Sequence, residues 1–508
     1  MLARLASAAL RGLDAEPVDV EVDLSRGLPS WSMVGLAEAA VRESRDRVRA
    51  ALLNSNFEFP LRHITVNLSP ADIRKDGSYF DLPVAVGLLI ASGQVDPNRG
   101  KSGEHPPFMI GELALDGRLN PTSGALPLAL FARAQGFKSI ILPEANADEA
   151  AVVDGIEVLP AKNLLAVARH LAGREQLVRH EEAKLSDSDA SNIIPDMSDV
   201  RGQQQARRAL EIAAAGSHHL LFSGPPGVGK SMLAQRLPGI LPLLTSQQKL
   251  EVARIYSISG ERDRAPLSAT PPYRAPHHSA SDVAMIGGGS IPKPGEVSKA
   301  HHGTLFLDEL PEYRRQVLEV LRQPLENGHV CIARAADTLV FPAQFQLVAA
   351  MNPCPCGYLG HPTRNCRCSG MQVRRYRTRI SGPLLDRFDL RVHVPPVDKE
   401  ELMGMATGEP SSRVATRVSE ARQRQYARQG DGVVNARLTP SQLETFAKPD
   451  AEGAKLLDAA MSRFSLSARS YHRILKVART IADIEGETNV SGNHVAEALQ
   501  YRGEEDEG

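Results

Sequence analysis

The feature that most constrains the fold of this chain is a glycine-rich segment near its middle. Residues 224–231 read Gly-Pro-Pro-Gly-Val-Gly-Lys-Ser, which matches the pattern G-x-x-x-x-G-K-[ST] at every fixed position. An apolar run at 220–222 precedes this segment, and a helix-compatible stretch at 232–237 follows it. This order predicts a buried strand, a tight turn and a helix N-terminus, the setting of a phosphate-binding loop in an α/β fold.

The residue types in this loop fit the chemistry of a nucleoside triphosphate. Glycine lets backbone N–H groups close around a polyphosphate, and the lysine ammonium is expected to reach the β- and γ-phosphates. The hydroxyl of Ser231 is expected to ligate Mg²⁺, so we predict ATP and Mg²⁺ as cofactors. The predicted binding residues are Gly224, Pro225, Pro226, Gly227, Val228, Gly229, Lys230 and Ser231.

A second apolar run, at 303–309, ends in two acidic residues. We expect Asp308 to hold the Mg²⁺ shell and Glu309 to polarise the attacking water. A G protein needs no second acid at this place, so the pair indicates an ATPase that turns over. The alternative is a strand that simply ends on two solvated carboxylates, and the nearby phosphate-binding loop disfavours it.

Length and composition limit the class of protein. The 508 residues suggest about three domains, and 42% hydrophobic with 23% charged residues are typical of a soluble globular chain. The net charge of −1 gives no reason to expect nucleic acid, so any basic surface must be local. No apolar run approaches the ~20 residues of a membrane span, and the N-terminal apolar stretch is too short for a secretory signal. Together with reduced cysteines, these features predict a cytoplasmic protein without a membrane contact.

Changes in composition along the chain predict its domain organisation. Residues 1–173 alternate strand-type runs with helical ones, which predicts a separate α+β domain. Residues 174–199 are polar and predict a linker. The nucleotide domain is expected over 200–396, and a helical, arginine-rich region over 397–508.

Three further motifs resemble those of the AAA+ ATPases. Leu-Val-Ala-Ala-Met-Asn-Pro resembles a sensor-1 strand, and this resemblance implies that Asn352 lies beside the γ-phosphate and the attacking water. Leu-Leu-Asp-Arg-Phe-Asp resembles an arginine-finger segment, which implies that Arg387 acts on the nucleotide of a neighbouring subunit. Leu-Ser-Ala-Arg-Ser resembles the start of a sensor-2 helix, with Arg469 as its arginine. The implied fold is a P-loop core with a parallel sheet, followed by an α-helical lid.

Two segments narrow the resemblance to the magnesium-chelatase-like AAA+ proteins of the ComM/YifB type. They are Tyr-Arg-Ala-Pro-His-His-Ser at 273–279 and Ile-Gly-Gly-Gly-Ser-Ile-Pro-Lys-Pro-Gly-Glu-Val at 286–297. The resemblance covers essentially the whole chain. His277 and His278 are interpreted as structural or nucleotide-proximal residues in preference to metal ligands.

This resemblance implies two elements that project into the pore of a ring. An insert in the second helix is expected at about 280–298, and a hairpin before sensor 1 at about 329–345. Lys293 in the first and Arg334 in the second are the expected DNA contacts. The implied function is that of a homo-hexameric ATPase acting on single-stranded and branched DNA during recombination or natural transformation. The alternative is a chelatase-type motor subunit that remodels a metal-insertion partner.

The N-terminal region is similar to the Lon-protease/ribosomal S5-like domain, on the strength of Gly-Glu-Leu-Ala-Leu-Asp-Gly-Arg-Leu at 111–119. That peptidase uses a Ser–Lys dyad, in which the lysine deprotonates the serine. Here the nucleophile position falls on Tyr79, with Ser78 adjacent, and the lysine position falls on Leu128. We therefore expect a catalytically inactive scaffold or DNA-engaging domain.

Four of the five cysteines form one cluster with the spacing C-x-C, nine residues, C-x-C. Their number is that of a structural Zn²⁺ site, with unligated reduced thiols as the alternative, and disulfides are disfavoured in a reducing compartment. The predicted ligands are Cys354, Cys356, Cys366 and Cys368.

The chain around these cysteines is basic. Between 352 and 385 there are six arginines and no acid, with Tyr358 and Tyr376 interleaved. Guanidinium groups bind backbone phosphates and aromatic rings stack on bases, so this segment predicts a DNA contact, with a solvated basic loop as the alternative. The predicted contacts are Arg374, Arg375 and Arg377.

Overall fold

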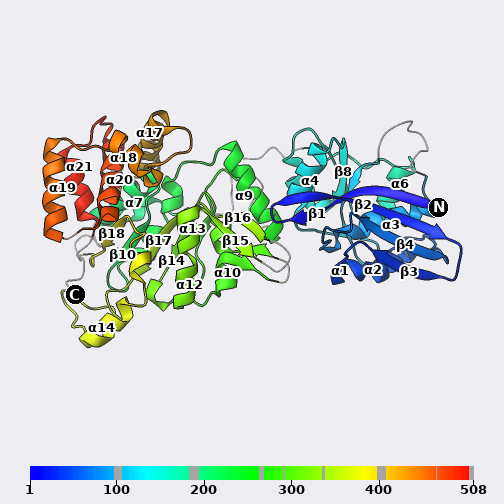
Figure 1. Cartoon of the computed structure of the whole chain (residues 1–508), viewed down its shortest axis with the longest axis horizontal. Helices are drawn as coiled ribbons and strands as arrows, with labels where there is room; N and C mark the ends of the chain where they lie inside the picture. The colour runs from blue at the N-terminus through cyan, green and yellow to red at the C-terminus, as the bar shows by residue number, and fades with distance from the viewer. Residues whose placement is uncertain are drawn as a thin grey trace.

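The chain folds into an elongated molecule with three successive parts (Figure 1). A β-rich N-terminal part lies at one end, a part centred on a parallel sheet lies in the middle, and a bundle of helices lies at the other end. The computed structural model describes residues 1–96, 106–181, 194–261, 268–289, 292–333, 338–397, 408–464 and 466–502.

The N-terminal part begins with a four-stranded sheet of order β1-β2-β4-β3. In β2 (Asp14–Ser25) every second side chain from Val18 to Leu24 is buried, as expected for a strand with one face on the core. Helix α3 (Asp81–Ala91) packs on this sheet and is buried along nearly its whole length. The other strands of the sheet are β1 (Leu2–Arg11), β3 (Ser30–Val34) and β4 (His63–Ser69).

A second, parallel sheet of order β5-β8-β9 completes this part. Its strands are β5 (Phe108–Met109), β8 (Ser139–Pro143) and β9 (Glu157–Ala161). The remaining elements are α1 (Ala39–Arg42), α2 (Ser44–Asn54), β6 (Glu112–Leu113), β7 (Leu119–Asn120), α4 (Ala125–Ala134), α5 (Ala147–Ala151) and α6 (Leu164–Leu171). The Ser78 hydroxyl donates to the carboxylate of Glu112, so its described partner is an acid and not a lysine.

The middle part contains a five-stranded parallel sheet of order β11-β14-β17-β10-β18. Its strands are β11 (Tyr273–Arg274), β14 (Thr304–Leu307), β17 (Gln346–Met351), β10 (Leu220–Ser223) and β18 (Leu390–His393). Every residue of β14 and of β17 is buried, because helices cover both faces of the sheet. The predicted α/β class with a parallel-sheet P-loop core is confirmed.

Helices and two hairpins surround this sheet. The helices are α7 (Gln204–Gly216), α8 (Lys230–Ala234), α9 (Ser246–Ser259), α10 (Asp282–Ile286), α11 (Glu296–Lys299), α12 (Arg315–Val320), α13 (Arg322–Asn327), α14 (Gly370–Arg377) and α15 (Gly382–Leu385). The hairpins pair β12 (Gly287–Gly288) with β13 (Lys293–Pro294), and β15 (His329–Ala333) with β16 (Thr338–Pro342). Lys293 is exposed on β13, whereas Arg334 lies outside the described residues.

The C-terminal part is helical, as predicted for the lid. Its helices are α17 (Ser411–Gln429), α18 (Pro440–Phe446), α19 (Ala451–Phe464), α20 (Ala468–Glu485) and α21 (Gly492–Gln500). Helices α17 and α20 pack on α7, so the lid shares a hydrophobic core with the central sheet. None of the helices in the described ranges has the length and apolar character that crossing a bilayer requires.

Helix α9 joins the middle part to the N-terminal part (Figure 1). Leu250 and Ala253 of this helix pack against the N-terminal core. The backbone N–H of Gly124 donates to Ser257 O over 2.9 Å, and Arg254 donates to the backbone oxygen of residue 13 over 2.6 Å. The two parts are therefore held by side-chain packing and by hydrogen bonds.

Candidate functional site

The phosphate-binding loop joins strand β10 to helix α8 at the carboxyl edge of the central sheet. A Cβ on Gly224 would lie 2.3 Å from the backbone oxygen of Val394, so only glycine lets the loop pass this close to its neighbour. Gly229 has a φ of +92° at the N-cap of α8, a conformation that side chains disfavour. The predicted strand–loop–helix arrangement is thus present.

Lys230 is buried and is held inside the loop. Its Nζ donates to the backbone oxygens of Gly224 and Pro225 over 2.7 and 2.8 Å, and to Asn352 Oδ1 over 3.0 Å. Burial lowers the pKa of Lys230 to about 8, and the nearby carboxylates of Asp308 and Glu309 only partly oppose that shift. Phosphate oxygens can replace these neutral oxygen partners, and they bring the negative charge that the present partners of the ammonium do not carry.

The two predicted Mg²⁺ ligands lie in direct contact. Ser231 Oγ donates to Asp308 Oδ2 over 2.5 Å, although the residues are 77 positions apart. The hydroxyl lies in the first turn of α8 and the carboxylate directly follows β14, and both are oxygen ligands of the kind that Mg²⁺ prefers. The donor set therefore fits the ion.

Glu309 lies next to this pair and is exposed. Its φ of +50° turns the chain sharply after β14, and its N–H donates to Asp308 Oδ1 over 2.8 Å. His278 Nδ1 lies 3.2 Å from Glu309 Oε2. The carboxylate predicted to polarise water therefore already has an intramolecular partner.

Arg387 lies at the opposite edge of the sheet. It precedes β18, whose first residue pairs with the first residue of β10, so it is close to the amino ends of the strands. Its guanidinium forms an ion pair with Glu326 at the end of α13. Burial and the guanidinium groups of Arg473, Arg469 and Arg322 lower the pKa of Arg387.

The structure therefore groups Arg469 with Arg387 and not with the loop residues. Arg469 lies in the first turn of α20, and its charge acts on both Arg387 and Arg473. By contrast, Lys230, Ser231 and Asn352 gather at the carboxyl edge. One chain presents the two halves of the predicted catalytic set on opposite edges of its sheet.

The four clustered cysteines bring their sulfur atoms together. Cys354 Sγ lies 3.4 Å from Cys356 Sγ and 3.6 Å from Cys366 Sγ, and Cys368 joins them within 4.8 Å. A tetrahedral zinc ion with Zn–S bonds of ~2.3 Å holds its sulfur ligands ~3.8 Å apart, so the set fits zinc. Backbone N–H groups of the loop lower the pKa of Cys356 to about 6, whereas burial and the neighbouring thiols raise the pKa of Cys366 and of Cys368, so without a metal the cluster favours one thiolate shared among thiols.

The cysteine loop packs against the phosphate-binding loop. Gly357 has a φ of +84°, and a Cβ at this position would lie 2.6 Å from the Pro226 ring. The same Cβ would lie 3.8 Å from Asn352. The segment that carries the cysteines therefore lies directly against the phosphate-binding loop.

Helix α14 presents the predicted DNA contacts unequally. Arg374 and Arg375 are exposed, whereas Arg377 is half-buried and donates to the backbone oxygen of Pro353 over 3.4 Å. Tyr376 is buried, and burial raises its pKa to about 12, so this ring faces the core and is not placed to stack on a base. Helix packing decides which face of α14 is covered, so of the two interleaved tyrosines Tyr376 is the one that it removes from the surface.

Comparison with known proteins follows the same division of the chain. Models of the magnesium chelatase subunit ChlI match residues 20–146 and 196–402, and a model of its C-terminal region matches 408–502. Competence protein ComM of Haemophilus influenzae is 46% identical over 507 residues, which cover 99% of this chain and 97% of ComM. The chain belongs to the ComM/YifB-type family of magnesium-chelatase-like AAA+ proteins. This confirms the predicted family, and it implies ATP and Mg²⁺ as cofactors.

Other relatives of this ComM/YifB-type protein differ in distance. YifB of Escherichia coli is 45% identical over 495 residues, which cover 97% of this chain and 96% of YifB. The Holliday junction branch migration complex subunit RuvB of Mycolicibacterium smegmatis is 23% identical over 350 residues, or 62% of this chain and 83% of RuvB. The second relationship is a distant one.

One partly buried group that sequence reasoning missed resembles a metal site. Glu251 on α9 lies 2.6 Å from His302 Nε2 and 3.3 Å from His301 Nε2. The Gln344 N–H donates to His301 Nδ1 over 3.0 Å, so in a neutral His301 the proton is on Nε2, which then donates to Glu251. We therefore interpret the trio as a hydrogen-bonded link and not as a metal site. No short-range sequence pattern marks it, because Glu251 is 50 residues away from His301.

Sequence reasoning also missed Arg314 and Arg315, which line a pocket beside α14. Each alone resembles an ordinary exposed residue at a helix start. The signal that was available was their position, a few residues after Glu309.

Proposed function

We propose that this protein is a cytoplasmic, ATP-driven DNA-remodelling motor that assembles as a homo-hexamer and moves branch points in DNA. The observation that carries the proposal is the continuity of segment 352–385. It starts at Asn352, which contacts Lys230, and it continues into the exposed arginines of α14. A basic surface and a nucleotide site that share one segment have the arrangement that couples DNA contact to ATP hydrolysis.

ATP hydrolysis is assigned to the residues at the carboxyl edge. Lys230 neutralises charge on the β- and γ-phosphates, while Ser231 and Asp308 hold Mg²⁺, which supplies further positive charge when it is bound. Glu309 orients the attacking water once its carboxylate leaves His278. Asn352 fixes the lysine and the water side by side.

The second half of the site comes from a neighbouring subunit. Arg387 and Arg469 lie at the amino edge of the sheet, so they complete the site of another copy and not that of their own chain. Clustered guanidinium groups that lower one another's affinity for protons favour an incoming anion, such as the γ-phosphate of the neighbour, which would replace Glu326 as the partner of Arg387. This arrangement supports a closed ring.

Zinc and the pore elements have supporting roles in the proposal. Zn²⁺ held by Cys354, Cys356, Cys366 and Cys368 would fix the loop that lies against Pro226 and leads into α14. Lys293, exposed on a hairpin of the second-helix insert, contacts DNA in the ring pore together with Arg334. The similarity to ComM and the distant similarity to RuvB support a DNA substrate, in competence or in recombination.

The second candidate function is a chelatase-type motor that remodels a metal-insertion partner, and the family models favour it. A comparison of ATP turnover with linear, forked and four-way DNA separates the two functions. We expect branched DNA to raise turnover and ATP to drive strand exchange through a four-way junction, with Lys230→Ala as the inactive control. If turnover is indifferent to every DNA form, the chelatase-type function is the better one.

A further inference from the structure

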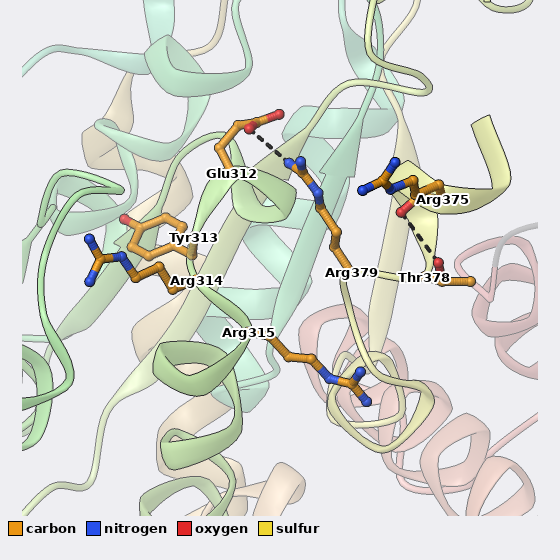
Figure 2. Close-up of a pocket in the computed structure, with 7 residues that line it drawn as sticks. All are labelled: Glu312, Tyr313, Arg314, Arg315, Arg375, Thr378 and Arg379. Atoms are coloured by element: carbon orange, nitrogen blue, oxygen red, sulfur yellow. Dashed lines mark hydrogen bonds and ion pairs between the residues drawn. The ribbon is translucent and has the colours of Figure 1, made fainter. Parts of the chain in front are cut away.

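A pocket of about 420 Å³ opens between the turn that follows Glu309 and the end of α14 (Figure 2). Figure 2 shows Arg379 reaching Glu312 across it, while Arg314 and Arg315 extend in different directions from adjacent positions. The lining residues are Glu312, Tyr313, Arg314, Arg315, Arg375, Thr378 and Arg379.

The pocket has an excess of positive charge. Its single carboxylate, Glu312, is already paired with Arg379 at 2.9 Å. In the parts of the chain that the structure describes, no carboxylate forms an ion pair with Arg314, Arg315 or Arg375. Glu319 is a further acid whose pKa the charge of Arg315 helps to lower, but it does not line the pocket. The four arginines that line the pocket outnumber its one carboxylate, so the local charge favours an anion there.

The surroundings indicate what kind of anion fits. All four arginines are exposed, so the pocket is open to a polymer and does not enclose a small ion. Arg374 is exposed next to Arg375 and extends the positive surface along α14. One guanidinium group binds a phosphate through two parallel N–H···O hydrogen bonds, and a row of arginines can contact successive phosphates of a nucleic-acid strand.

The floor of the pocket belongs to the catalytic turn. Arg379 donates to the backbone oxygen of Pro311 over 3.1 Å as well as to Glu312, two and three residues after Glu309. Tyr313 is buried and donates to Pro276 O over 2.5 Å, in the segment that carries His278, the partner of Glu309. Arg379 is therefore bonded to the turn that follows Glu309, and Tyr313 connects that turn to the segment of His278. A shift of Arg379 can in this way alter the contact between His278 and Glu309.

We infer that this pocket binds a backbone phosphate of single-stranded nucleic acid and reports its presence to Glu309. The phosphate takes Glu312's place as the partner of Arg379, and the freed turn lets Glu309 leave His278. The inference rests on the proposed function, and it adds a binding site and a route by which DNA stimulates hydrolysis.

The test uses the full chain with a fluorescein-labelled single-stranded oligonucleotide. Binding is measured as a function of salt, and ATP turnover is measured with and without that oligonucleotide. The pocket variant is Arg314→Ala/Arg315→Ala, and the charge-matched control is Arg413→Ala/Lys455→Ala on exposed faces of the lid. Circular dichroism verifies the fold, and Arg314→Lys/Arg315→Lys restores charge without the paired donors.

Loss of the phosphate contact in the pocket should reduce the salt slope of binding by about 0.7, because each neutralised phosphate contributes ~0.7 on single strands. The pocket variant should also lose most of the DNA stimulation of turnover, while the control behaves like the parent. Glu312→Gln should act in the opposite direction and tighten binding, because it releases Arg379; a merely structural role does not predict a gain.

Three results overturn the inference, and they are distinguishable. If the parent binds DNA and the pocket variant keeps its affinity and salt slope, the pocket assignment falls while the proposed function stands. If the parent binds no DNA, both fall together. If the pocket variant loses ATP binding without DNA present, the pocket serves a nucleotide and not a nucleic acid.

Discussion

Raising the pH through 8 should weaken ATP binding, because Lys230 loses its proton. Burial lowers the pKa of Lys230 to about 8, against about 10.4 for a lysine in solvent. Phosphate oxygens stabilise the charged form, so nucleotide binding raises the pKa of Lys230 again. Binding above pH 8 therefore takes up a proton, and the affinity must fall as the pH rises.

The size of the effect follows from the same pKa. With a pKa of about 8 in the free protein, the charged fraction falls from about 0.9 at pH 7 to about 0.1 at pH 9. The dissociation constant should then rise about tenfold across these two pH units. The affinity depends on pH between the pKa of Lys230 in the nucleotide-free protein and its higher pKa in the nucleotide-bound protein.

The assay is a fluorescence titration with a slowly hydrolysed ATP analogue from pH 7 to 9. The control is Lys230→Arg, whose guanidinium stays charged throughout, so its dissociation constant should not change with pH whatever its absolute value. The reasoning is refuted if the parent binds equally well at both ends of the range. It is also refuted if Lys230→Arg shows the same slope as the parent.

Three further predictions concern hydrolysis, assembly and zinc. Glu309→Gln should keep ATP bound and slow hydrolysis by at least ~10², the usual scale for a lost base, and the parent rate in this variant would refute its role. Arg387→Ala should impair turnover and spare ATP binding, as filter binding and phosphate release can show; unchanged turnover at saturating protein would place the finger elsewhere. Metal analysis should find about one zinc per chain in the parent and none in Cys354→Ser, because one of four thiolate ligands is lost; zinc-free parent protein with normal DNA binding would contradict the site.

The parts of the fold that sequence predicted best are those with short-range rules. The phosphate-binding loop needs glycines and a lysine at fixed offsets, so its strand, turn and helix could be placed from the order of the residues alone. The proximity of Ser231 and Asp308 could be expected as well, because the loop after β10 and the residues after β14 both lie at the carboxyl edge of one parallel sheet, with β17 between the two strands.

Contacts that depend on tertiary packing could not be predicted in this way. Helix α14 turns Tyr376 toward the core and leaves Arg375 exposed, and the spacing of these residues in the sequence does not reveal which side is covered. The partner of Glu309 is His278, which follows a different strand, β11. Arg315 can be identified as a pocket residue only once the fold brings it close to Arg375 of α14. Each of these depends on segments distant in sequence that meet only in the folded chain.

The placement of Lys230 and Arg387 on opposite edges of one sheet has a genetic consequence. A protein that lacks the lysine and a protein that lacks the arginine should each be inactive alone. In the proposed ring, mixing the two would create some contacts that unite an intact lysine of one chain with an intact arginine of the other. Two defective alleles expressed in one cell should then complement each other, whereas two defects in the same allele should not be rescued by a copy of itself.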